Sequence, residues 1–272
     1  MSAPSPSDTL TELAGRYWRV FLDYHPSYAS SLGHREYDHL LPGSSPKARA
    51  AHFAALKGLS DELKAIDGSA LGGEDAITLE SLGTTLRQDL AAEAHREDRW
   101  SINPLFGTHV WIAEMASRQP VGTDKELGAL RSRFSQVPAY VAQELSNFQE
   151  GLDLGQVAFE AAVERTIGQI QRILNTPRSA SPFLPPSLRE GATPEGLSTE
   201  AIAAFNKTID TDVIPALKRY QTFLESSYAP KARTSPGLNS IPGGEDYYRY
   251  SSSYFTGRER DPQVGHQTGL DE

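Results

Sequence analysis

The histidines and acidic residues of this chain do not form a known catalytic or metal-binding motif. The sequence contains seven histidines and no cysteine, and no histidine pair has the His-Glu-x-x-His spacing that places two zinc ligands on one helix face. His34 and His39 flank Asp38, but they lie more than one helical turn apart in an irregular segment. We therefore predict no catalytic residue, no metal ligand and no cofactor within this chain.

Four residues are candidates for contact with a substrate, and each also has a structural interpretation. Pro104 biases the preceding Asn103 to an extended conformation. The Asn103 side chain could contact a ligand, or it could bond the backbone of its own turn. Tyr247 and Tyr248 follow a glycine-rich bend, where one phenol could donate to an oxyanion. Because neighbours on a helix point in different directions, we expect one of them in the core and the other exposed. His266 is a lone histidine without a partner at metal-ligand spacing.

The charge pattern argues against nucleic acid and membrane partners. The chain has 35 acidic and 26 basic residues, a formal charge of −9, and no basic run that could release counterions from a phosphate backbone. No segment approaches the ~20 apolar residues of a membrane span. Residues 1–8 lack the features of a signal peptide, so we expect a flexible N-terminus and a cytoplasmic protein. Without a spatial partner, Glu114, Glu144 and Glu164 are expected to face solvent.

Apolar residues recur at helical spacing along most of the chain and predict an all-α fold. The expected helices cover about 7–32, 46–66, 74–96, 127–134, 138–155, 159–174, 202–224 and the segment from 265. Ser7 or Asp8 is expected to cap the first helix, and Pro215 should produce a kink near Thr211. The proline-rich stretch 178–199 indicates a long loop. We predict one domain over residues 1–272, an antiparallel assembly of about eight to ten helices without a sheet.

The aromatic stripes divide into an expected core set and a set near the C-terminus. Tyr17, Phe21, Tyr24 and Tyr28 lie at helical spacing and are expected in the core. The C-terminal set consists of Tyr247, Tyr248, Tyr250, Tyr254 and Phe255. Either these residues fold back onto earlier helices, or they form an exposed apolar surface that favours self-association.

Short blocks in a fixed order resemble one bacterial family. The blocks are Tyr17-Trp18, His25-Pro26, Leu32-Gly33, Tyr37-Asp38, Asn103-Pro104-Leu105, Val137-Pro138-Ala139-Tyr140, Val163-Glu164-Arg165, Val213-Ile214-Pro215-Ala216, Tyr228 to Arg233, Gly237-Leu238 to Pro242-Gly243, Tyr247-Tyr248 and His266 to Leu270. Together they resemble the N-terminal half of the "domain of unknown function 885" family. The resemblance implies a helical fold similar to zinc peptidases, whose His-Glu-Gly-x-Pro-Gly-His motif lies in a C-terminal half.

This resemblance leads to two functional interpretations. In the first, the chain is the N-terminal scaffold of a metallopeptidase-like protein, is catalytically incomplete, and needs a C-terminal half or partner chain to bind zinc. In the second, it is a natural short, non-catalytic helical protein that binds a peptide or a protein partner. An unrelated helical enzyme is a more distant third. The reading frame beyond Glu272 would separate the first two, because only a truncated peptidase would continue into the zinc motif.

Overall fold

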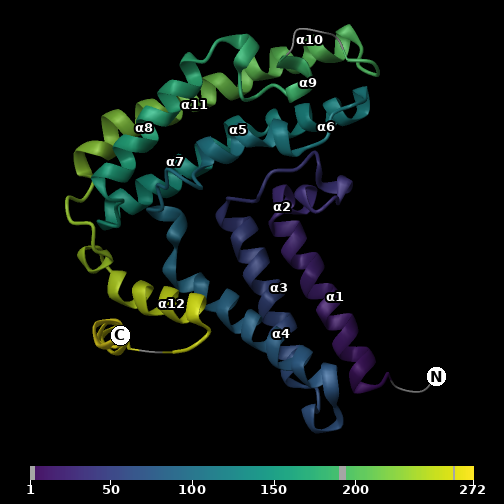
Figure 1. The fold of residues 1–272 in the computed structure, drawn as a ribbon, viewed down its shortest axis with the longest axis vertical. Helices are drawn as coiled ribbons and strands as arrows, with labels where there is room; N and C mark the ends of the chain where they lie inside the picture. Colours follow the sequence, from purple (N-terminus) through teal and green to yellow (C-terminus); the bar gives the residue numbers. More distant parts are fainter. Residues whose placement is uncertain (1–3, 190–193, 260) are drawn as a thin grey trace. The chain divides into compact units, whose positions relative to one another are not determined.

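The structure, a computed structural model, describes residues 4–189, 194–259 and 261–272. In these residues all regular secondary structure is helical (Figure 1), and β pairing is limited to an isolated bridge between Phe159 and Arg233. The all-α prediction is therefore confirmed. The contacts divide the chain into two compact units, which are described separately; that the whole chain is one domain stays a prediction.

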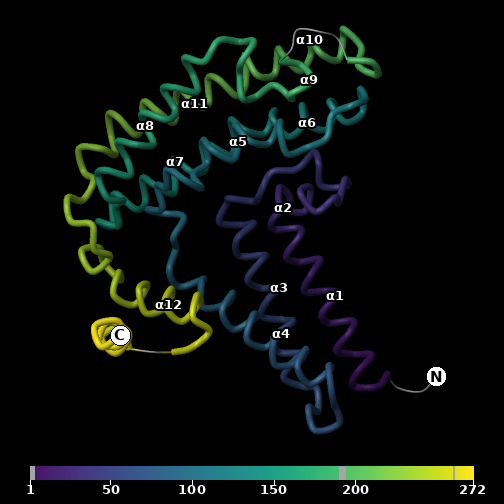
Figure 2. Tube along the Cα trace, viewed as in Figure 1, coloured from purple at the N-terminus to yellow at the C-terminus, as the bar shows by residue number. Residues whose placement is uncertain are grey.

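Unit 1 comprises residues 1–21, 46–96 and 237–272. Its helices are most of α1 (Pro6–Tyr24), α3 (Pro46–Lys64), α4 (Gly73–Ala91), α12 (Gly244–Thr256) and α13 (Pro262–Asp271). Helices α3 and α4 lie side by side (Figures 1 and 2). With α1 they bury a mostly aliphatic core of Leu10, Leu13, Phe53, Leu56, Leu59, Leu63, Leu82 and Leu86.

The first helix begins earlier than the sequence pattern predicted. Ser5 caps it: the Ser5 hydroxyl accepts a hydrogen bond from the backbone N–H of Asp8 (3.2 Å), and the Asp8 carboxylate accepts one from the N–H of Ser5 (3.2 Å). This is a reciprocal capping arrangement, with Pro6 in the first turn where its missing N–H costs nothing. Residues 1–3 of the predicted flexible N-terminus lie outside the described residues.

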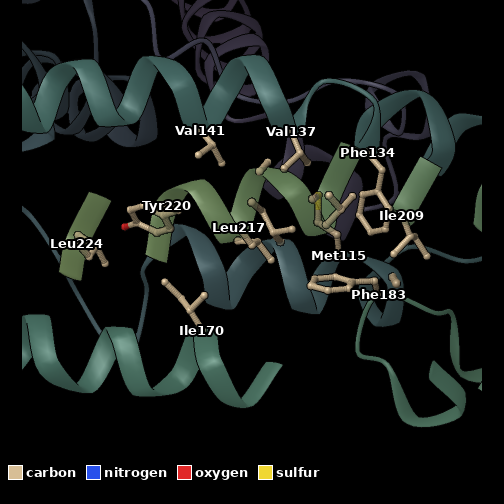
Figure 3. Packing of buried hydrophobic residues seen from close by; sticks show 14 of the residues in the cluster. Met115, Phe134, Val137, Val141, Ile170, Phe183, Ile209, Leu217, Tyr220 and Leu224 are labelled. Atoms are coloured by element: carbon tan, nitrogen blue, oxygen red, sulfur yellow. The ribbon is translucent and has the colours of Figure 1, made fainter. Parts of the chain in front are cut away.

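Unit 2 comprises residues 22–45 and 97–236. Its helices are α2 (Pro26–Ser31), α5 (Thr108–Arg118), α6 (Asp124–Phe134), α7 (Val137–Leu154), α8 (Glu160–Asn175), α9 (Pro186–Arg189), α10 (Thr199–Thr208) and α11 (Ile214–Phe223). Figure 3 shows part of the core of this unit, with labelled side chains from α5, α6, α7, α8 and α11 among them. Within it, the ring of Phe134 stacks on Phe205 (centroids 5.6 Å apart) and meets Phe183 edge-on.

Prolines divide the longest predicted helices, as their chemistry requires. Pro215 has no N–H to bond the carbonyl four residues earlier, and a π-helical turn, Ile209–Val213, replaces regular helix at the predicted kink. At His25, the helix predicted to run to position 32 ends, and α2 begins at Pro26. The break changes the phase of the aromatic stripe, so Tyr28 is 51% exposed and the prediction that it lies in the core is wrong.

Candidate functional site: a pocket in unit 2

An open pocket of about 250 Å³ lies in unit 2 among α2, the loop before α5, α5 itself and α6. It is lined by Ser27, Tyr28, Ser30, Ser31, Leu105, Phe106, Val110, Trp111, Glu114, Met115, Arg118, Gln119 and Arg133. Its wall is mostly apolar, with polar groups from α2, α5 and α6. Pockets for drug-sized ligands start at roughly 300 Å³, so this one suits a single amino-acid-sized group.

A buried guanidinium forms the polar part of the pocket. Arg133 is 1% exposed and donates to Oε1 of Gln119 (3.0 Å), to Oγ of Ser30 (2.6 Å) and to the carbonyl of Tyr37. Burial lowers the pKa of Arg133 to about 10, an effect that the nearby carboxylate of Asp38 opposes. The guanidinium is therefore positively charged at neutral pH, and it ties α2 and α6 together.

Three buried polar atoms of the pocket residues have no hydrogen-bond partner. They are Nε of Arg133, Nε2 of Gln119 and Oγ of Ser27. The orientation of the Gln119 amide is set by Arg133, because a guanidinium can only donate and the atom that faces it must be the amide oxygen. The amide NH₂ is consequently the unpartnered group. Each of the three atoms can donate a hydrogen bond, so these lining residues have donor capacity that the protein itself does not use.

Asn103 shapes one edge of this pocket without lining it. Its Oδ1 accepts hydrogen bonds from the backbone N–H groups of Leu105 (2.8 Å) and Phe106 (3.2 Å), the turn that its sequence context predicts. The turn holds both apolar side chains at the pocket, where they are 69% and 82% exposed. Gly107 closes the turn, because a Cβ there would lie 2.3 Å from the carbonyl oxygen of Asn103. Direct contact of Asn103 with a substrate stays a prediction.

A second polar group lies beside the pocket wall. Trp111 meets the ring of Tyr140 edge-on, with centroids 5.0 Å apart. One turn further along α7, the carboxyl group of Glu144 accepts a hydrogen bond from Oγ1 of Thr108 (2.5 Å), and its other oxygen is buried without a partner. Burial raises the pKa of Glu144 to about 7. The expectation that Glu144 faces solvent is therefore wrong.

His109 comes directly after Thr108 and is fully buried. Its Nε2 lies 2.8 Å from Oε1 of Gln169, and its Nδ1 is buried without a partner. Burial lowers the pKa of this imidazole, so it is neutral at neutral pH. Because the partner of its Nε2 is an amide that does not titrate, the ring fits a structural hydrogen bond between α5 and α8 better than a ligand or base role.

The other three predicted site residues lie in unit 1, away from any described pocket. Tyr248 is 52% exposed, as expected for one of the pair. Tyr247 is half-buried with its ring edge-on to His95 (5.6 Å), so it does not lie in the core as expected for the other. His266 is exposed on α13. A substrate-binding role of these residues stays a prediction. Over the described residues, no group of three or more His, Cys, Asp or Glu side chains could hold a metal ion.

The sequence did contain a signal for two buried charged residues that the sequence analysis did not predict. Arg133 lies three positions after Leu130, and Glu144 three after Val141, so each charge interrupts an apolar helix face. Such a residue is either buried with partners or lies at the edge of the apolar face. Gln119 and Ser27 carried no comparable signal, because neither is charged and polar residues at helix ends are common.

Comparison with known proteins places the chain in a family. The sequence profile described as "Bacterial protein of unknown function (DUF885)" matches residues 26–272. The chain belongs to this family. No curated protein matches the sequence.

Two solved structures have a similar fold. A "putative lipoprotein" from Colwellia psychrerythraea superposes with a TM-score of 0.81 at 16% identity over 99% of this chain and 49% of that protein. A "putative lipoprotein of unknown function" from Shewanella oneidensis gives 0.55 at 15% identity, over 82% of this chain and 38% of the other. The chain thus spans about half or less of the proteins whose fold it resembles.

These similarities contradict the prediction of a cytoplasmic protein, because both structures are described as lipoproteins. That prediction relied on the lack of signal-peptide features in residues 1–8 and on the lack of an apolar segment. No helix in the described parts of the chain has the length and apolar character needed to cross a membrane. A lipoprotein is held at a membrane by its acyl chains, which need no such helix. The missing apolar segment was therefore not evidence for a cytoplasmic location.

Proposed function

We propose that this chain is the N-terminal, ligand-binding part of a longer metallopeptidase-like protein of the DUF885 family, and that it is not catalytic by itself. The observation that carries this proposal is the unit 2 pocket, which combines an apolar wall with the buried guanidinium of Arg133. The length of the similar structures supports a longer protein. The hydrolytic part of the proposal rests on the resemblance to zinc peptidases, and any zinc would bind in a C-terminal half.

The second candidate is a short, non-catalytic helical protein that binds a peptide or a protein partner. The same pocket would serve it, because neither candidate assigns chemistry to residues 1–272. The two candidates differ in the sequence expected beyond Glu272. In the first, a C-terminal half completes an active site, and in the second the pocket acts alone.

Binding to the pocket can be measured by the fluorescence of Trp111, one of three tryptophans in the chain. A panel of N-acetylated amino acids and short peptides is titrated into the protein, and Trp111→Phe identifies the responding ring. The variant Phe106→Ser should weaken binding because it removes an apolar group at the pocket. The matched control is Phe255→Ser, since Phe255 in unit 1 is 83% exposed and Phe106 is 82% exposed. The absence of a Trp111 response to the whole panel would refute the proposed binding role.

The catalytic part of the proposal needs a separate experiment. The 272-residue chain is incubated with zinc and dialysed, and its metal content and peptide hydrolysis are compared with those of the chain extended to the end of its reading frame. We expect stoichiometric zinc only in a longer chain, because tight zinc sites need three or four placed ligands. Stoichiometric zinc and chelator-sensitive hydrolysis in the 272-residue chain would contradict the proposal.

A further inference from the structure

We propose that the unit 2 pocket binds the carboxylate group of a small apolar ligand, through Arg133, Gln119 and Ser27. This inference rests on the proposed binding function and specifies its ligand class. The proposed ligand carries a negatively charged group that accepts several hydrogen bonds. This group is attached to an apolar substituent about the size of a leucine or phenylalanine side chain. A C-terminal residue of a peptide and a simple carboxylic acid both carry it.

The hydrogen-bonding capacity of the pocket points to an acceptor. Arg133 and Gln119 are 1% and 4% exposed, and each has a buried nitrogen with no partner. A buried donor without a partner costs roughly 1–3 kcal/mol, so a ligand that satisfies several donors at once gains affinity from each. A carboxylate has about four lone-pair sites and no hydrogen to donate. It can accept from the Arg133 and Gln119 nitrogens and from the Ser27 hydroxyl.

The charges around the pocket favour an anion over a cation. Among the lining residues, Glu114 and Arg118 bind each other (2.5 Å), so their charges largely cancel. The remaining lining charge is the guanidinium of Arg133. Asp38 interacts electrostatically with this guanidinium and offsets part of its charge, but it does not line the pocket. Hydrogen bonds between a guanidinium and a carboxylate are charge-assisted and stronger than neutral ones.

The rest of the pocket fits an apolar substituent. Val110, Trp111 and Met115 present their side chains from α5, and Phe106 adds an exposed ring from the loop before it. Burial of apolar surface contributes about 25 cal/mol per Å². A volume of about 250 Å³ accommodates one such substituent with its carboxylate and leaves little room for more.

The probes are N-acetyl-L-leucine and its neutral analogue N-acetyl-L-leucinamide, which have nearly the same shape. Binding is followed by calorimetry and Trp111 fluorescence. We expect the acid to bind about tenfold more tightly or better, the factor that one charge-assisted hydrogen bond supplies. Two further probes, N-acetyl-alanyl-leucine and 4-methylpentanoate, distinguish the sources: preference for the dipeptide indicates a peptide C-terminus, and equal binding of 4-methylpentanoate indicates a simple carboxylic acid.

The decisive variant is Gln119→Glu. It retains an oxygen that accepts from Arg133 but replaces the unpartnered NH₂ with a negative oxygen, so it should weaken the acid about tenfold or more and leave the amide nearly unaffected. Gln263→Glu, an exposed position on α13, is the control for one added negative charge. If circular dichroism shows that Gln119→Glu does not fold, Ser27→Ala tests the same site, since it removes one donor without adding charge.

Each result bears on the proposal. Selective loss of acid binding in Gln119→Glu, or in Ser27→Ala if it is needed, supports the carboxylate site. Equal affinity for acid and amide overturns it, as does unchanged acid affinity in a folded variant. If both probes bind wild type equally and Phe106→Ser weakens both, the carboxylate assignment fails while the proposed binding pocket stands. If neither probe nor any panel member binds, both proposals fail.

Discussion

The two units differ in the polarity of their interiors. Unit 1 buries a mostly aliphatic cluster from α1, α3 and α4, and its ion pair between Arg16 and Glu62 lies at the surface, with side chains 38% and 49% exposed. In the described chain, every buried polar or charged residue belongs to unit 2: Ser30, Asp38, Thr108, His109, Gln119, Arg133, Asn147, Thr166 and Ser181.

This difference separates a scaffold from a candidate binding region. Burying a polar group costs free energy unless it is hydrogen-bonded, and an aliphatic core such as that of unit 1 avoids this cost. Unit 2 places several polar groups out of solvent and leaves some of them without partners, Arg133 and Gln119 at the pocket among them. Unsatisfied buried groups are uncommon and are found where a ligand or a special role explains them.

The largest expected difference between the units is the loss of stability when an arginine of each unit is replaced. Arg133→Met leaves the Tyr37 carbonyl, Ser30 and Gln119 without their buried hydrogen-bond donor. We expect a loss of about 3–5 kcal/mol in the free energy of unfolding. Arg16→Met removes only a surface ion pair from unit 1 and should leave the urea midpoint almost unchanged. Urea unfolding of both variants, followed by circular dichroism, makes the comparison. Equal midpoints would show that the two interiors do not differ as described.

The next largest effect is a pH dependence in unit 2. The pKa of Glu144 is about 7 in the folded protein and 4.5 in its ordinary state, so between these values the folded chain holds a proton that the unfolded chain releases. The contribution of Glu144 to the free energy of unfolding is fully present below about pH 4.5 and is lost as the pH rises through about 7. The total loss is at most about 3 kcal/mol. Glu144→Gln should remove this dependence, measured by urea unfolding at pH 5 and pH 8. Glu80→Gln, at an exposed position of unit 1, should not.

A smaller effect distinguishes two helical glycines. A Cβ at Gly151 of α7 would lie 2.1 Å from the carbonyl oxygen of Arg99, whereas none of the neighbours of Gly58 on α3 comes within 4 Å. Gly151→Ala should therefore destabilise unit 2 by about 2 kcal/mol through overpacking. Gly58→Ala should stabilise unit 1 by up to about 1 kcal/mol, because alanine loses less backbone entropy in a helix. Thermal unfolding that shifts in the same direction for both variants would contradict this packing difference.

The smallest effect on stability is expected at the exposed aromatic residues of unit 1. Tyr247 and Tyr250 pack on His95, but Tyr254 and Phe255 are 43% and 83% exposed. Their double replacement by Ser should change the unfolding free energy by no more than about 0.5 kcal/mol while reducing self-association and binding of a hydrophobic dye. Self-association is measured by sedimentation velocity over a wide concentration range. A wild-type chain that is monomeric and dye-silent throughout would refute the predicted association.

Local chemistry in the sequence determined much of the helical structure. Apolar periodicity predicted most of the longer helices but not α5 or α12. Pro215 predicted the irregular turn near Thr211, because a missing N–H affects only the residues one turn away. The turn of Asn103 was predictable for the same reason: its side chain bonds the backbone of its immediate neighbours. The family resemblance was also correct, since the ordered blocks lie in the sequence itself.

Burial of charge depended on contacts that are distant in sequence. Arg133 donates to Ser30 and to the carbonyl of Tyr37, which lie about a hundred positions away in the sequence. Burial raises the pKa of Glu144, and its hydrogen bond to Thr108, on another helix, opposes this shift. Periodicity records which residues share a helix face, but not which helix covers that face or which polar group it brings. The sequence by itself therefore determined most of the helices and the break near Pro215, whereas the tertiary structure decided which polar groups were buried beside the pocket.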